Sequence, residues 1–192
     1  MNFIDLQNYG VVEHQLPNKL LLSLKKQVKK IMKNKPTMYS NLIGNKPPHY
    51  FLTDTKELAN VISETINAYN TQYNYIPSYT ILTKSVPLTF DKPWVNSMSS
   101  DQYISNHTHD GVYSYSCWID VPYKTIFEFS YSNILGTLVR KEYTIDKSYE
   151  GRIFLFPSLL THCTYTLEKS KKKRLCISGN VSFNTDHKTV CK

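Results

Sequence analysis

The second half of the chain is a succession of short segments with strand composition, and this feature most narrows the folds open to it. Each segment is rich in valine, isoleucine, threonine, tyrosine and phenylalanine, which favour extended backbone. The segments lie at residues 79–90, 112–121, 125–132, 140–145, 151–157, 161–166 and 174–183. Many short strands at close spacing are typical of a sandwich or a barrel. The sequence therefore predicts a mainly β protein.

Two amphipathic helices are predicted before these segments. In the first, four apolar residues recur at helical spacing between Leu20 and Ile31, lysines occupy the opposite side, and Pro36 ends the pattern. The second begins at Asp54, which can cap it, and its apolar stripe continues to Tyr69. We expect both helices to pack on the sheet.

These patterns predict one structural domain with two parts. Residues 1–78 are expected to form an N-terminal helical support region packed on a barrel, and residues 79–192 to form the β core. The four cysteines lie far apart without a C-x-x-C pair, which favours reduced, buried thiols over disulfides or a thiolate zinc site.

The charge and the hydropathy pattern bear on partners and location. A net charge of +8 and a pI of about 9.2 favour anionic partners. The lysines are spread over the N-terminal third and one late cluster, so nucleic acid is left open as a partner but not favoured, and a solvated outer face is expected for the first helix. No apolar run approaches the roughly 20 residues of a membrane span, and the N-terminus lacks signal-peptide order. We expect a soluble protein in the cytoplasm, the host cytoplasm if the chain is viral.

Two histidines separated by one residue come just before the segment at 112–121. Residues i and i+2 of an extended chain point to the same face, so His107 and His109 can present both imidazoles to one point. His162, at the start of another predicted strand, can supply a third. Imidazole suits iron, copper, zinc and nickel alike, so these residues do not choose the metal. A bulge before Gly111 would instead turn Asp110 inward.

An arginine opens the last predicted strand. Alternation places Arg174, Cys176, Ser178 and Asn180 on one face of that strand. A guanidinium on an inward face requires an anion, and its planar fork matches a carboxylate with two parallel hydrogen bonds. The alternative is that Arg174 ends the basic run "KSKKKR" at a solvated hairpin tip.

The order "WVN … H-x-H-x-G … EGRIFLFPSLLTH … R-x-x-x-S-x-N", over about residues 93–184, resembles the iron(II)- and 2-oxoglutarate-dependent dioxygenase superfamily. Within it the chain is similar to the small oxygenases of tailed-phage genomes. The resemblance implies a double-stranded β-helix, a cupin-like jelly roll. It also implies Fe(II) bound by His107 and His162, with no catalytic residue beyond the metal ligands, and 2-oxoglutarate held by Arg174.

The chain departs from the superfamily pattern at two positions. Most members have H-x-D or H-x-E, whereas this chain has His109 there and Asp110 one residue later. Alternation favours His109 as the ligand, with Asp110 as the alternative. Cys176 stands where related sequences often carry a small hydroxyl residue, and Ser178 is expected to supply that hydrogen bond to the co-substrate.

The resemblance implies hydroxylation of an unidentified substrate by O2 with release of succinate and CO2. The residues that could line the cavity are Trp94, Asn96, Tyr103, Tyr113, Tyr115 and Asn180, although with fifteen tyrosines in the chain a place in the aromatic core is the simpler expectation for any single one. Two other functions stay open: a cupin-like metal-binding protein without 2-oxoglutarate, and a non-enzymatic phage accessory or structural protein.

Overall fold

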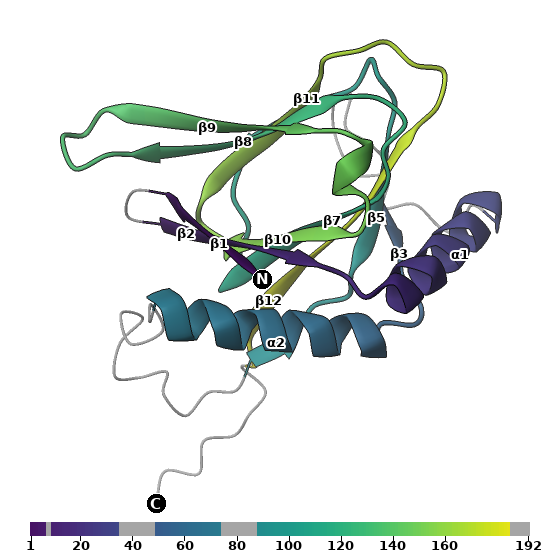
Figure 1. Cartoon of the computed structure of the whole chain (residues 1–192), viewed down its shortest axis with the longest axis horizontal. Coiled ribbons are helices and arrows are strands. Elements are labelled where there is room, and N and C mark those ends of the chain that lie inside the picture. Colours follow the sequence, from purple (N-terminus) through teal and green to yellow (C-terminus); the bar gives the residue numbers. More distant parts are fainter. Residues whose placement is uncertain (7–8, 35–48, 74–87, 185–192) are drawn as a thin grey trace, which may run out of the picture.

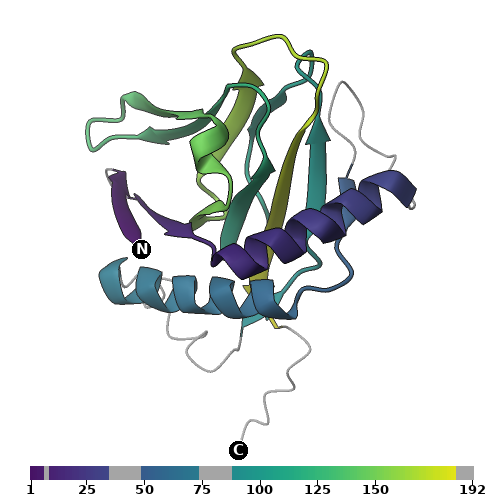
Figure 2. The same cartoon turned by 45° about the vertical axis from the view of Figure 1, so that its right-hand side comes forward.

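The computed structural model describes residues 1–6, 9–34, 49–73 and 88–184. Two antiparallel sheets face each other and form a double-stranded β-helix, with two helices on one side (Figures 1 and 2). The larger sheet contains β1 (Asn2–Leu6), β2 (Tyr9–Gln15), β10 (Arg152–Pro157), β7 (Tyr113–Asp120), β12 (Arg174–Phe183), β5 (Trp94–Met98) and β3 (His49–Phe51) in spatial order, and β4 (Leu88–Phe90) pairs with the end of β12. The smaller sheet contains β6 (Ile104–His107), β11 (Thr161–Thr166), β8 (Thr125–Ser132) and β9 (Leu138–Ile145).

Both predicted helices are confirmed and pack on the outer face of the larger sheet. Helix α1 spans Asn18–Asn34 and α2 spans Lys56–Tyr73. Their apolar stripes join the side chains that β2, β7, β10 and β12 direct outward from the barrel. In α1 the buried residues are the apolar positions between Leu20 and Ile31 that the sequence pattern singled out. Neither helix is long and apolar enough to cross a membrane.

A second core fills the space between the sheets and is mostly aromatic. Trp118 of β7 meets Phe127 of β8 and Phe154 of β10 edge to face, with ring centroids 5.6 and 4.9 Å apart. Phe129 and Phe156 extend this cluster toward His162. Because successive side chains of a strand point to opposite faces, β7 sends Tyr113 to α2 and Trp118 to the barrel interior.

Six of the predicted strand segments, from residue 112 onward, correspond to β7–β12. In the segment at 79–90, only Leu88–Phe90 is described, and it forms β4. The proposed boundary between residues 78 and 79 lies outside the described residues. The sequence analysis did not predict the strands that precede the helices. Among them, β2 pairs with β10, so residues near the N-terminus extend the larger sheet.

Candidate metal centre

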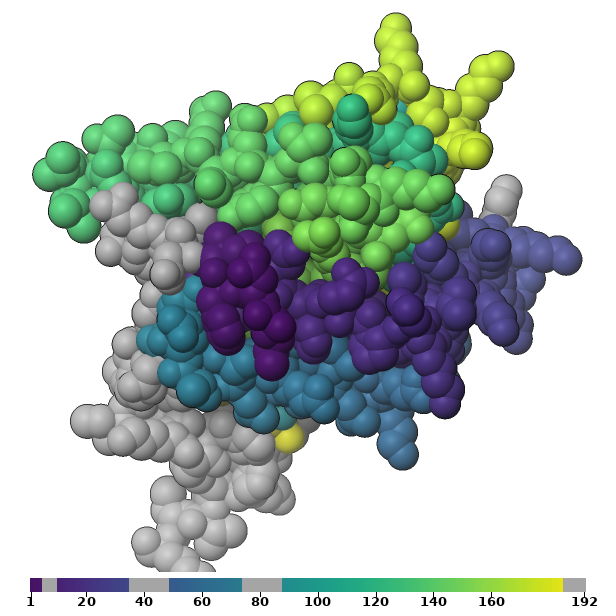
Figure 3. All heavy atoms as spheres, viewed as in Figure 1, coloured from purple at the N-terminus to yellow at the C-terminus, as the bar shows by residue number. Residues whose placement is uncertain are grey.

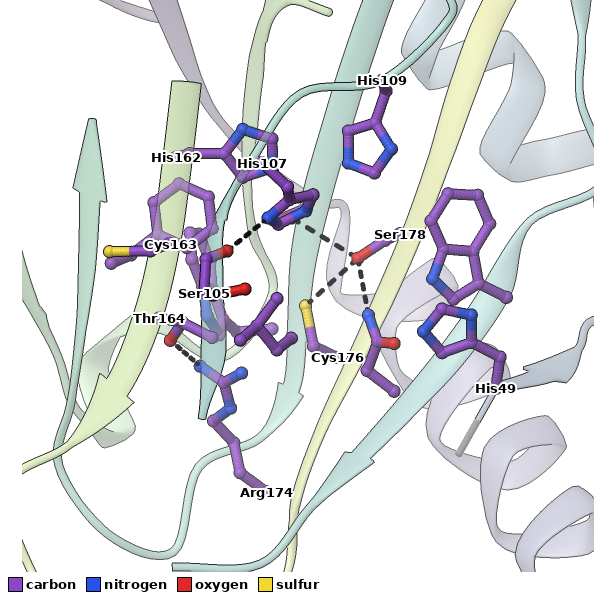
Figure 4. Close-up of a pocket in the computed structure, with 16 residues that line it drawn as sticks. His49, Ser105, His107, His109, His162, Cys163, Thr164, Arg174, Cys176 and Ser178 are labelled. Atoms are coloured by element: carbon purple, nitrogen blue, oxygen red, sulfur yellow. Dashed lines mark hydrogen bonds between the residues drawn. The ribbon is translucent and has the colours of Figure 1, made fainter. Parts of the chain in front are cut away.

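The structure brings the three predicted histidines together (Figure 4). His107 is the last residue of β6, and it is paired directly with His162 of β11. His109 lies in the turn that leads into β7, not in a strand. The nitrogen atoms that could bind a metal all lie within 4.8 Å of one another, and the His107 and His162 ring centroids are 4.3 Å apart.

Two of the rings are each held in one tautomer by a backbone carbonyl. Nδ1 of His107 lies 2.8 Å from the carbonyl oxygen of Ser105, and Nδ1 of His162 lies 2.9 Å from that of Leu160. A carbonyl oxygen only accepts hydrogen bonds, so each Nδ1 carries the proton and donates it. The lone pair of each ring is then on Nε2, which is the arrangement that metal-binding histidines usually show.

Burial keeps two of the three histidines uncharged. Desolvation, reinforced by neighbouring His107, lowers the pKa of His162 to about 3, although the bond to Leu160 opposes the shift. Desolvation and His107 also lower the pKa of His109 to about 4. Both imidazoles are therefore neutral at pH 7, and a metal does not need to displace their protons.

The turn that carries His109 is fixed by close backbone contacts. The His109 N–H donates to the carbonyl oxygen of Ser158 at 2.9 Å. A Cβ added at Gly111 would lie 2.8 Å from Ser158 Oγ and 3.0 Å from the Val181 carbonyl oxygen, so glycine lets the chain pass close to β12 and the turn after β10. In this arrangement His109 faces the other two histidines, whereas Asp110 is exposed.

Arg174 is buried in the barrel, so the solvated hairpin tip considered for it is wrong. Its side chain is 2% exposed and donates from one terminal nitrogen to the hydroxyls of Thr125 and Thr164, at 3.1 and 3.2 Å. It forms no ion pair within the described part of the chain, and its Nε has no hydrogen-bond partner there. A buried guanidinium without a carboxylate is unfavourable, so this arrangement calls for an anionic ligand.

One cavity of about 120 Å³ connects the histidines with Arg174. Figure 4 shows His107, His109 and His162 at one end and the guanidinium at the other. Three buried polar atoms of its lining have no hydrogen-bond partner among the described residues: Asn96 Oδ1, Trp118 Nε1 and Arg174 Nε. Unpaired buried polar groups of this kind are expected to bind a ligand or ordered water. The full lining is His49, Trp94, Asn96, Ile104, Ser105, His107, His109, Ser116, Trp118, Phe127, His162, Cys163, Thr164, Arg174, Cys176 and Ser178.

Two of the residues expected at the cavity are found in its lining. Trp94 and Asn96 line the cavity, and so do Cys176 and Ser178 on the face of β12 that carries Arg174. Asn96 Nδ2 donates to Ser178 Oγ at 3.0 Å, which fixes that hydroxyl beside the Cys176 thiol.

Other predicted lining residues lie elsewhere. Tyr103 is 58% exposed, outside the cavity. Tyr113 and Tyr115 point to the opposite face of β7, where Tyr113 hydrogen-bonds to Asn70 of α2 and Tyr115 packs over Gly179. Asn180 accepts a hydrogen bond from Ser114 beyond the end of the cavity. The alternation of side chains along β7 explains why Tyr113 and Tyr115 belong to the core under the helices, since Ser116 and Trp118 face inward instead.

His49 is a lining residue that sequence reasoning missed. It lies in a three-residue strand, and its ring stacks on Trp94 with centroids 5.5 Å apart. Trp94 in turn lies 6.0 Å from the His109 ring. No pattern in the sequence marks His49, because β3 is brought to the site only by its pairing with β5.

Comparison with known proteins identifies the fold. No family model and no curated relative matches the sequence. The structure named OsALKBH1 is similar with a TM-score of 0.62 at 11% identity, over 93% of this chain and 99% of that one. A prolyl-4-hydroxylase from Pseudomonas putida has a TM-score of 0.60 at 10% identity, over 92% of each chain. EctD from S. alaskensis, determined with 2-oxoglutarate and 5-hydroxyectoine, has a TM-score of 0.52 at 11% identity, over 92% of this chain and 72% of that one. The fold is therefore the double-stranded β-helix of 2-oxoglutarate-dependent oxygenases.

Proposed function

We propose that this protein is an Fe(II)- and 2-oxoglutarate-dependent dioxygenase that hydroxylates its substrate. The observation that carries the proposal is Arg174, a buried guanidinium with no carboxylate partner among the described residues, in the same cavity as three clustered histidines. When bound, iron with 2-oxoglutarate and O2 supplies the oxidant, and succinate and CO2 are released.

His107, His109 and His162 are the proposed metal ligands, through the nitrogens that face one another. A set of three neutral imidazoles leaves the full charge of the ion uncompensated. This charge strengthens the hold on an anionic co-substrate compared with a site that contains a carboxylate ligand.

Arg174 and Ser178 are the proposed co-substrate residues. One terminal nitrogen of Arg174 is committed to Thr125 and Thr164, and the other donates one N–H to Met98 Sδ at 3.6 Å and keeps a second N–H. That second N–H and the Nε–H form the proposed fork for the distal carboxylate of 2-oxoglutarate. Ser178, fixed by Asn96, offers a hydroxyl between the arginine and the histidines. The apolar walls from Trp118 and Phe127 exclude water from the reacting centre.

The test is succinate formation. Protein loaded with Fe(II) is incubated with 2-oxoglutarate and O2, and succinate is measured against the His162→Ala variant, which lacks one proposed ligand. We expect succinate above that reference. A folded protein that binds metal but releases no succinate above the His162→Ala level would favour a cupin-like metal protein. A folded protein that binds no metal would favour a non-enzymatic role.

A further inference from the structure

The outer face of α1 concentrates the positive charge of the molecule. The 17 residues of this helix carry six lysines and no acidic residue, in a chain whose net charge is +8. The buried apolar side chains all lie on the opposite face, against the larger sheet. Figure 3 shows the helix at the edge of the molecule with its outer side uncovered in this view.

Five of these lysines form one continuous stripe. Lys19, Lys26, Lys29, Lys30 and Lys33 are all exposed. At 100° per residue they fall within an arc of about 100°, and at 1.5 Å per residue they extend along about 21 Å of the helix. None of the five forms an ion pair with any residue that the structure describes.

The sixth lysine and a glutamine fix the orientation of this stripe. Lys25 Nζ forms an ion pair with Glu150, at the edge of the stripe. Gln27 Oε1 accepts hydrogen bonds from the backbone N–H groups of Thr53 and Asp54, at 2.9 and 3.0 Å. With the apolar face buried as well, the helix cannot rotate about its axis, so the stripe is presented to solvent in a fixed position.

The charges of the stripe repel one another and destabilise α1 when no anionic partner is bound. Lys26 and Lys30, and likewise Lys29 and Lys33, are like charges at i,i+4 spacing, which repel each other on a helix surface. A run of phosphates would relieve this repulsion and release its own condensed counterions. An anionic membrane is a poorer match, because the apolar residues that would enter the bilayer are buried against the sheet, leaving only Leu22, 60% exposed, within the stripe.

We infer that the α1 lysine stripe is a binding surface for the phosphate backbone of a nucleic acid. This inference does not depend on the proposed oxygenase reaction. It differs from the expectation of a merely solvated face because the five charges are aligned, unpaired and held outward by the packing of the helix.

The test uses a fluorescein-labelled duplex DNA of 20 base pairs, with binding followed by anisotropy as a function of salt. The stripe variant replaces Lys26, Lys29 and Lys30 by glutamine, which keeps the helix propensity. The matched control replaces the exposed Lys169, Lys171 and Lys173 by glutamine and removes the same charge from the loop between β11 and β12.

We expect the stripe variant to bind at least about tenfold more weakly and to lower the salt slope by about 3, because each lost phosphate contact removes about 0.9 from that slope. The melting temperature should be unchanged or higher, because repulsion is relieved. The loop control should change affinity much less. Equal losses in both variants would show that only net charge matters and would overturn the inference. It would also be overturned if wild-type protein failed to bind DNA at low salt, or bound only vesicles of anionic phosphatidylserine.

Discussion

Replacing Arg174 by lysine should weaken 2-oxoglutarate binding without removing the metal. The guanidinium can keep its bonds to Thr125 and Thr164 and still offer two N–H groups to a carboxylate. An ammonium has no such fork, so a lysine that binds the carboxylate forms a single contact in place of two. Loss of one charge-assisted hydrogen bond corresponds to about 1.5–3 kcal/mol, or about tenfold to more than a hundredfold in affinity.

The measurement is anaerobic titration of 2-oxoglutarate into the iron-loaded variant, with metal content determined in parallel. Arg140→Lys serves as the matched control, because that arginine is exposed on the outer face of the smaller sheet, beside Glu128. Unchanged 2-oxoglutarate affinity in folded, metal-loaded Arg174→Lys protein would refute the carboxylate clamp. A similar loss in Arg140→Lys would show that the effect is not local to the cavity.

Three further predictions concern the histidine cluster. His109→Ala should abolish metal binding, and Asp110→Asn should leave it unchanged. His109→Asp should retain iron with altered turnover. Metal analysis that finds iron lost from Asp110→Asn but kept by His109→Ala would reverse the assignment of the second ligand. Gly111→Ala should lower metal affinity and destabilise the fold by about 1–3 kcal/mol, because the added Cβ meets Ser158 and Val181; an equally tight metal site in that variant would argue against the close packing of this turn. The pKa values of His109 and His162 are lowered in the folded state, so the unfolded state binds more protons. The free energy of unfolding of the metal-free protein should therefore fall as pH decreases below about 6.5. Urea titrations that show the same pH dependence for wild type and His162→Gln would contradict this.

The residues that share one strand or a short loop could be placed from the sequence. Arg174, Cys176 and Ser178 line the cavity because strand alternation is a local property that the sequence displays. The meeting of His107 and His162 was expected from the family resemblance, and the register of β6 with β11 produces it. His109 faces the cluster although it lies in a turn, because backbone bonds and Gly111 shape that turn rather than regular strand alternation.

Long-range pairing was the part that the sequence could not supply. His49 reaches the cavity only through the pairing of β3 with β5, and β2 enters the larger sheet only through β10. The sequence around Tyr115 is typical of a strand whichever face of the sheet the side chain occupies. The face it takes depends on which side of the sheet the helices cover. That choice is made by the tertiary fold.

The most direct test of the central claim is the visible absorption spectrum of the Fe(II) protein under anaerobic conditions, before and after 2-oxoglutarate is added. Chelation of iron by the keto acid should produce a charge-transfer band, whereas succinate, which has no keto group, should produce none. We predict a band that saturates at one equivalent of 2-oxoglutarate per iron and is absent in His162→Ala. A folded protein that binds iron but develops no band at saturating 2-oxoglutarate would contradict the account.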